Sequence, residues 1–176
     1  MDLAFFEALT PTEARRLLEE YLATESQACL ELVERAAADG VVADFSVDSV
    51  AGVLRWAVAR VGTVPIAPDP DEPEWIRTSA PYLASLFEFD PPSSSLLLAA
   101  SYYLGESFVR SYPGLSWTTG DVEYALQNQP VVAGFRHDLE LPAVQVTESL
   151  FARVVKDPTK ITDIDRAVET WRRSAP

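Results

Sequence analysis

Apolar residues recur at intervals of three and four along most of the chain, the spacing that gathers them on one face of a helix. The first such stretch follows the run TPTE at 10–13, a capping box with proline at the first helical position. Gly40 can end the stretch in a left-handed conformation. The pattern therefore predicts one long amphipathic helix over 11–38.

A second helical pattern follows Ser46, a suitable N-cap, and predicts a helix over 47–61. From 63 to 73, prolines remove backbone donors and favour extended backbone, so we predict a solvent-exposed connector there. Four carboxylates in or beside it repel one another: Asp69, Asp71, Glu72 and Glu74. The apolar residues of 75–89 are expected to return and pack on the core.

The pattern over 91–111 is apolar on nearly every side in its middle. Asp90 followed by Pro91 is typical of an N-cap with proline in the first turn, and Pro113 with Gly114 ends the pattern. A helix that is apolar all round is enclosed by other elements. We therefore predict that 91–111 is a buried central helix.

Shorter patterns follow the central helix. Segments 115–119 and 130–135 are strand-like, with a further piece at 139–141 and a helical turn expected over 122–127. These segments predict a small sheet. Two more helices are expected, one opening at Pro142 and stopping at Asp157-Pro158, the other capped by Thr162.

The length of 176 residues is that of one ordinary domain. We expect a single domain over 1–176, with a helical part at 1–90 followed by the central helix, small sheet and C-terminal helices of 91–176. The predicted fold class is α+β, mainly α, around a long buried central helix with a small β-sheet. The sequence has no apolar stretch long enough to span a membrane, and its start lacks the basic, apolar and small-residue regions of a signal peptide. A cytoplasmic location is therefore expected.

The formal net charge is −13, and residues 1–90 carry −11 of it. Such a charge opposes binding to nucleic acid or to an anionic membrane. It has two interpretations: solubility, or a surface that attracts a basic protein. The scarcity of lysine and the many alanines point to a bacterial source.

Single copies of cysteine and histidine limit the chemistry that the chain can perform. Cys29 and His137 rule out an internal disulfide, a cysteine-rich zinc site and a multi-histidine centre. No glycine pattern matches a phosphate-binding loop or a dinucleotide fingerprint, so no cofactor is expected. Cys29 falls on the apolar stripe of the first helix, where a thiol acts as a small hydrophobic group.

Five residues near the central helix and the sheet are candidates for contact with a ligand or partner. Glu106 and Arg110 have the spacing of a helical ion pair that is either structural or aimed at a ligand. We expect Trp117 to be either a core residue or a residue that contacts a ligand. Arg136 and His137 lie after a strand, where we expect an exposed turn, with a general base as the alternative.

Four acidic residues could offer oxygen ligands to a hard cation: Asp121, Glu123, Asp138 and Glu140. Their spacing lacks the alternating pattern of a calcium loop, so no metal site is assigned.

Residues 100–110, with Leu104-Gly105-Glu106 and the later Arg110, lead to Gly114 and Trp117. This run resembles uncharacterised bacterial domains in which a long helix precedes a strand with the pattern Gly-x-x-Trp. The resemblance covers about 95–155. Some such domains occur in toxin–immunity settings, so it implies a small acidic protein that binds a toxin, and it transfers no catalytic residues.

The sequence thus favours a non-catalytic, protein-binding domain, with an immunity-type inhibitor of a basic toxin as its specific form. The partner would approach Asp69, Asp71, Glu72 and Glu74. The alternative is a small enzyme or a small-molecule-binding protein that uses a cleft between the central helix and the sheet, with Glu106, Arg110, Trp117, Arg136 and His137 as its polar residues. The oligomeric state is not predicted.

Overall fold

A computed structural model describes residues 3–79, 86–121 and 126–176. It is 63% helical, with two small two-stranded sheets, so the predicted mainly α fold is confirmed. Within these described ranges, no helix has both the length and the apolar character needed to cross a membrane.

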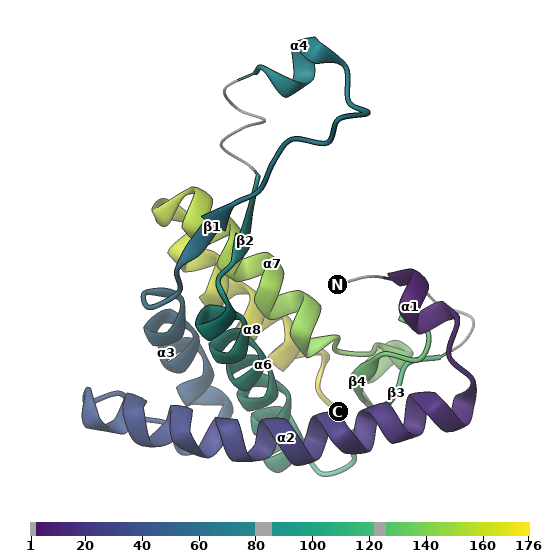
Figure 1. Cartoon of the computed structure of the whole chain (residues 1–176). Coiled ribbons are helices and arrows are strands. Elements are labelled where there is room, and N and C mark those ends of the chain that lie inside the picture. Colours follow the sequence, from purple (N-terminus) through teal and green to yellow (C-terminus); the bar gives the residue numbers. More distant parts are fainter. Residues whose placement is uncertain (1–2, 80–85, 122–125) are drawn as a thin grey trace.

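The central helix is α6, Pro91–Ser111, as predicted. It packs against α2 (Pro11–Ala38), α3 (Val47–Val58) and α7 (Ala143–Lys156), and Figure 1 shows α2 crossing the front of this bundle. Tyr103, Leu104 and Phe108 in its middle are almost completely buried. The Tyr103 hydroxyl accepts a hydrogen bond from the Phe45 amide at 3.0 Å and shares another with Ser49 Oγ at 2.5 Å, which satisfies a polar group inside the core.

The N-terminal helix α2 begins with the predicted capping box. Thr10 Oγ1 accepts from the Glu13 amide at 3.3 Å, and Glu13 Oε2 accepts from the Thr10 amide at 2.9 Å. The hydrogen bonds from Thr10 lower the pKa of the Glu13 carboxyl. A short helix, α1 (Leu3–Glu7), precedes it and is held in place because Asn128 Nδ2 donates to the carbonyl groups of Phe6 and Leu9.

Two expected boundaries are wrong by a few residues. The second helix, α3, ends at Val58, and Ala59 and Arg60 form a turn after it. Thr162 is the first residue of the last helix, α8 (Thr162–Ser174), and does not cap it, because the 3₁₀ turn η2 (Pro158–Ile161) leads straight into that helix. Helix α8 packs on α3, where Arg55 pairs with Asp165.

The predicted small sheet forms after the central helix. Strands β3 (Ser116–Thr119) and β4 (Pro130–Ala133) pair antiparallel, with Trp117 opposite Val132. The expected third piece contributes one bridge, between Val132 and Leu141. The helical turn expected over 122–127 falls largely outside the described residues.

The solvent-exposed connector predicted over 63–73 is observed, since most of its residues are exposed, but it begins with a strand that the pattern did not predict. Strand β1 (Thr63–Pro65) pairs antiparallel with β2 (Phe87–Phe89), and the chain between them carries the short helix α4 (Glu74–Arg77). Figure 1 shows α4 at the far end of this projection. We call residues 63–79 and 86–89 the arm, since 80–85 lie outside the described residues.

The expected return of 75–89 to the core is therefore wrong for Trp75, whose exposed fraction is 76%. The physical reason is the β1–β2 pairing, which directs the chain away from the helices before α4 forms. Phe89, at the base of the arm, does pack against the core. Of the apolar residues that were expected to return, Tyr82 and Leu83 lie outside the described residues.

Candidate functional site

Glu106 and Arg110 of α6 form the ion pair that their spacing predicts, with Arg110 Nε donating to Glu106 Oε1 at 2.8 Å. The Glu106 side chain is only 16% exposed and that of Arg110 is 52% exposed. The Arg110 guanidinium also lies over the ring of Phe45, 3.9 Å from its centroid. Both charged groups are thus engaged by neighbours within the protein.

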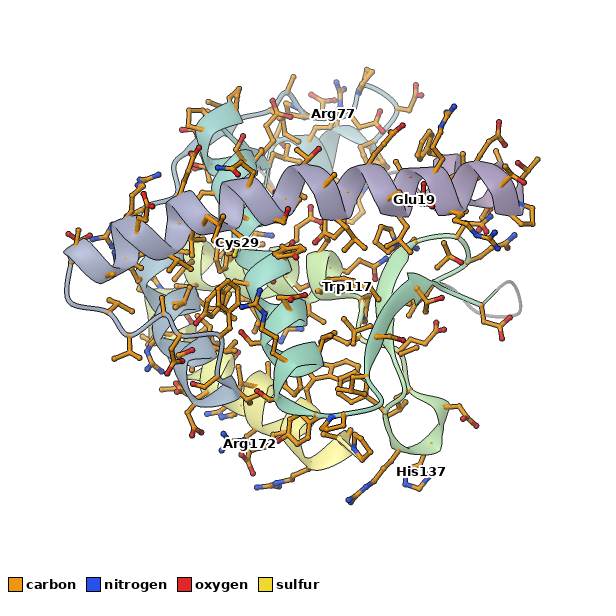
Figure 2. The ribbon with its side chains drawn as sticks, turned by 90° about the horizontal axis from the view of Figure 1, so that it is seen from below. Glu19, Cys29, Arg77, Trp117, His137 and Arg172 are labelled. Atoms are coloured by element: carbon orange, nitrogen blue, oxygen red, sulfur yellow. The ribbon has the colours of Figure 1, made fainter. Side chains whose placement is uncertain are left out.

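Trp117 completes this arrangement from strand β3. Its indole Nε1 donates to the other carboxylate oxygen of Glu106, Oε2, at 3.2 Å. The ring stacks on Tyr102 at a centroid distance of 5.8 Å and meets Tyr21 edge-on at 5.6 Å. In the view of Figure 2, Trp117 lies below α2, and its side chain is partly buried against the core. We call Tyr21, Tyr102, Glu106, Arg110 and Trp117 the Trp117 cluster.

Gly105 makes the Trp117 cluster possible. A Cβ atom at this position would lie 2.3 Å from both Cζ2 and Cη2 of the indole, closer than atoms can approach. Only a residue without a side chain therefore lets Trp117 lie directly against α6. Packing thus explains two residues of the run Leu104-Gly105-Glu106. Gly105 leaves room for the indole of Trp117, and Glu106 accepts the hydrogen bond of the indole.

The electrostatics around the Trp117 cluster do not favour Cys29 as a nucleophile. Burial raises the pKa of Tyr102 to about 12, and that of the neighbouring Cys29 thiol to about 12. Burial also raises the pKa of Tyr21. These groups stay protonated at neutral pH, whereas a nucleophilic thiol must ionise. The placement of Cys29 in the core agrees with the structural role expected from its helical stripe.

Arg136 and His137 lie apart from the Trp117 cluster, in the turn η1 (Arg136–Asp138). Both are exposed, and Figure 2 shows His137 at the edge of the molecule, pointing outward. The exposed turn predicted for His137 is thus observed. The structure brings Glu106, Arg110 and Trp117 together and leaves Arg136 and His137 elsewhere.

Three of the four acidic residues considered for a cation line one hollow of about 360 Å³: Asp121, Asp138 and Glu140. Burial raises the pKa of Glu140, whose Oε2 accepts from the Asp121 amide at 3.4 Å. Glu123 lies outside the described residues. Across 3–79, 86–121 and 126–176, no three histidine, cysteine or acidic side chains are arranged to hold a metal ion.

The four carboxylates of the arm precede an exposed apolar side chain in the sequence. Asp69, Asp71 and Glu74 are exposed, Glu72 is half-buried, and Trp75 follows directly. Val64 and Ile66, near the base of the arm, are also exposed. The sequence analysis did not predict the exposure of Trp75. One signal for it was present: Thr78 and Ser79, three and four positions later, are polar, so Trp75 does not belong to an apolar helical stripe.

A cavity also lies between α6 and β4, where the alternative function placed its cleft. Its volume is about 110 Å³, and its walls include Leu98 of α6 and Pro130 of β4. None of the five polar candidates, Glu106, Arg110, Trp117, Arg136 and His137, is among the described residues that line it.

Comparison of the chain with protein-family models, with curated proteins and with solved structures finds no match. The resemblance carried by residues 95–155 therefore stays a prediction.

Proposed function

We propose that this protein is a non-catalytic binding domain that engages a basic protein partner through its acidic arm. An immunity-type inhibitor of a basic toxin is the specific form of this proposal. The observation that carries it is the position of Trp75, a large apolar side chain that is 76% exposed on a projecting helix and directly follows an acidic stretch of the sequence.

The exposed indole supports a macromolecular partner. Tryptophan offers a large, rigid contact surface and is enriched among the residues that dominate binding energy in protein interfaces. Partner binding would remove from water a surface that folding leaves exposed. Trp75 would then act as the anchor of the interface, inserted into an apolar pocket of the partner.

The charge of the arm supports a basic partner. Asp69, Asp71, Glu72 and Glu74 are accompanied on the arm by one base, Arg77. Complementary charges steer two proteins together and favour the correct orientation before the apolar contact forms. A second copy of this chain, itself carrying −13, would be repelled by the same field.

The dispersal of the other polar candidates supports a non-catalytic role. Glu106, Arg110 and Trp117 bind one another, and Arg136 and His137 lie on a separate exposed turn. An active site requires such groups to converge on one concavity where a substrate can lie within reach.

A capture experiment with matched variants tests the proposal. The wild-type chain, W75A and a fourfold arm variant (D69N, D71N, E72Q, E74Q) are immobilised and exposed to lysate of the native source at low salt. The control is E19Q, E20Q, E31Q and E34Q on the exposed face of α2, which changes the net charge by the same amount. We expect one basic protein to be retained by the wild type and the control and lost by both arm variants. Equal retention by all four chains would contradict the proposal.

A further inference from the structure

The cavity between α6 and β4 is lined by five parts of the chain. Its apolar walls include Phe6 of α1, Leu17 of α2, Leu98 of α6, Pro130 of β4 and Val144 of α7. We propose that this cavity binds a small apolar molecule of about the size of a benzene ring.

The chemistry of the lining selects an apolar ligand. Charged side chains are absent from the described part of the lining. Its polar side chains bind within the protein: Gln145 Nε2 donates to Gln129 Oε1 at 2.6 Å, and the Tyr21 hydroxyl shares a hydrogen bond with Ser101 Oγ at 3.3 Å. An ion would lose hydration on entry and find no charged partner.

The volume of the cavity limits the size of the ligand. An apolar cavity of about 150 Å³ in another protein takes up benzene or xenon and stays free of water. This cavity measures about 110 Å³ and is open to solvent on one side, so a single ring or a short alkyl chain fits without complete enclosure. A ligand there would restore dispersion contacts that the wall atoms lack on their open side.

The walls are held in position before any ligand arrives. Asn128 Nδ2 donates to the carbonyl oxygens of Phe6 at 3.0 Å and Leu9 at 2.9 Å, which ties the N-terminal segment to the loop before β4. Pro130 and Pro142 restrict the backbone at two other points of the lining. A preformed site loses little conformational entropy on binding.

A titration of the full chain with benzene, followed by methyl NMR, tests this site. We expect saturable shifts of the methyl signals of Leu17, Leu98 and Val144. The variant V144F fills the cavity with an aromatic ring and should weaken benzene binding at least tenfold. Val146 lies on the same helix but does not line the cavity, so V146F should bind benzene as the wild type does. Benzoate, the same ring with a charge, should give no saturable shift.

Three results would overturn the site: shifts that never saturate and spread over the whole surface, equal benzene affinity in V144F and the wild type, or binding of benzoate as tight as that of benzene. If far-UV circular dichroism shows that V144F does not fold, L98F is the second filling variant and carries the same expectation. The arm is tested separately, because W75A should retain full benzene affinity.

Discussion

The helical body and the arm place their tryptophans in opposite surroundings. Trp117 lies against α6, stacks on Tyr102 and donates to a carboxylate, so each part of the indole has a partner within the fold. Trp75 stands on a four-residue helix at the end of a projection and remains largely in water. The same side chain therefore stabilises the fold in one region and is available to a partner in the other. Substitutions that remove or disturb packed side chains of the body should lower stability, whereas, under the proposed function, substitutions in the arm should lower binding.

The largest effect on stability is expected at the centre of the body. Leu104→Ala removes a fully buried side chain from α6 and leaves a cavity, which should lower the free energy of unfolding by about 2–5 kcal/mol. Denaturant unfolding measures the change. An unchanged midpoint would mean that α6 is not the centre of the core.

The next largest effect on stability is expected where Trp117 of β3 packs against α6. Gly105→Ala places a methyl group against the indole of Trp117, and the resulting strain should destabilise the protein by about 1–3 kcal/mol. The matched control is Gly52→Ala in α3, where a Cβ atom would lie 3.8 Å from Val41 Cγ1. There the alanine should stabilise the helix by about 0.5–1 kcal/mol. Changes of the same sign in both variants would contradict the role assigned to Gly105.

A smaller, pH-dependent effect is expected at Glu25 of α2, a buried carboxyl whose pKa is raised by burial. The carboxyl of Glu25 therefore holds its proton more tightly in the folded chain than in the unfolded chain. As the pH rises above the unfolded pKa of about 4.3, ionisation of this carboxyl lowers the free energy of unfolding.

Glu25→Gln removes that cost. It should raise the free energy of unfolding at pH 7, with the gain vanishing below about pH 4. Thermal unfolding between pH 3 and 8 measures it, with E19Q on the exposed side of the same helix as the control. A gain that is equal at both ends of this range would exclude the carboxyl's charge as its cause.

The smallest effect on stability is expected in the arm. Trp75→Ala and the fourfold variant D69N, D71N, E72Q and E74Q should change the free energy of unfolding by less than about 0.5 kcal/mol, because these side chains bury little surface. Once a partner has been captured, the fourfold variant should associate more slowly at low salt. The difference should shrink at high salt, since exposed charges are screened over about 8 Å at physiological ionic strength. Equal association rates would leave the carboxylates as plain solvated surface.

Much of the body could be predicted because its signals are local. The capping box at 10–13, the proline-led start of α6 and the all-round apolar pattern of 91–111 each depend on residues within a few positions. The ion pair of Glu106 and Arg110 was predictable for the same reason, since one helical turn separates them.

The sheet of the arm could not be found in this way. Strands β1 and β2 have three residues each, too few to show a period, and the pairing of Thr63 with Phe89 joins distant parts of the chain. The exposure of Trp75 follows from that pairing.

By itself, the sequence determined the existence of the long helices α2, α3, α6, α7 and α8, the burial of α6, the position of the small sheet and the strongly acidic character, because capping, periodicity and charge are properties of neighbouring residues. Only the tertiary structure decided that Tyr21 meets Trp117, that Gly105 admits the indole and that Phe6, Leu98 and Val144 line one cavity. These contacts join residues far apart along the chain, and their geometry depends on how whole elements pack. The sequence carries no local pattern for such packing.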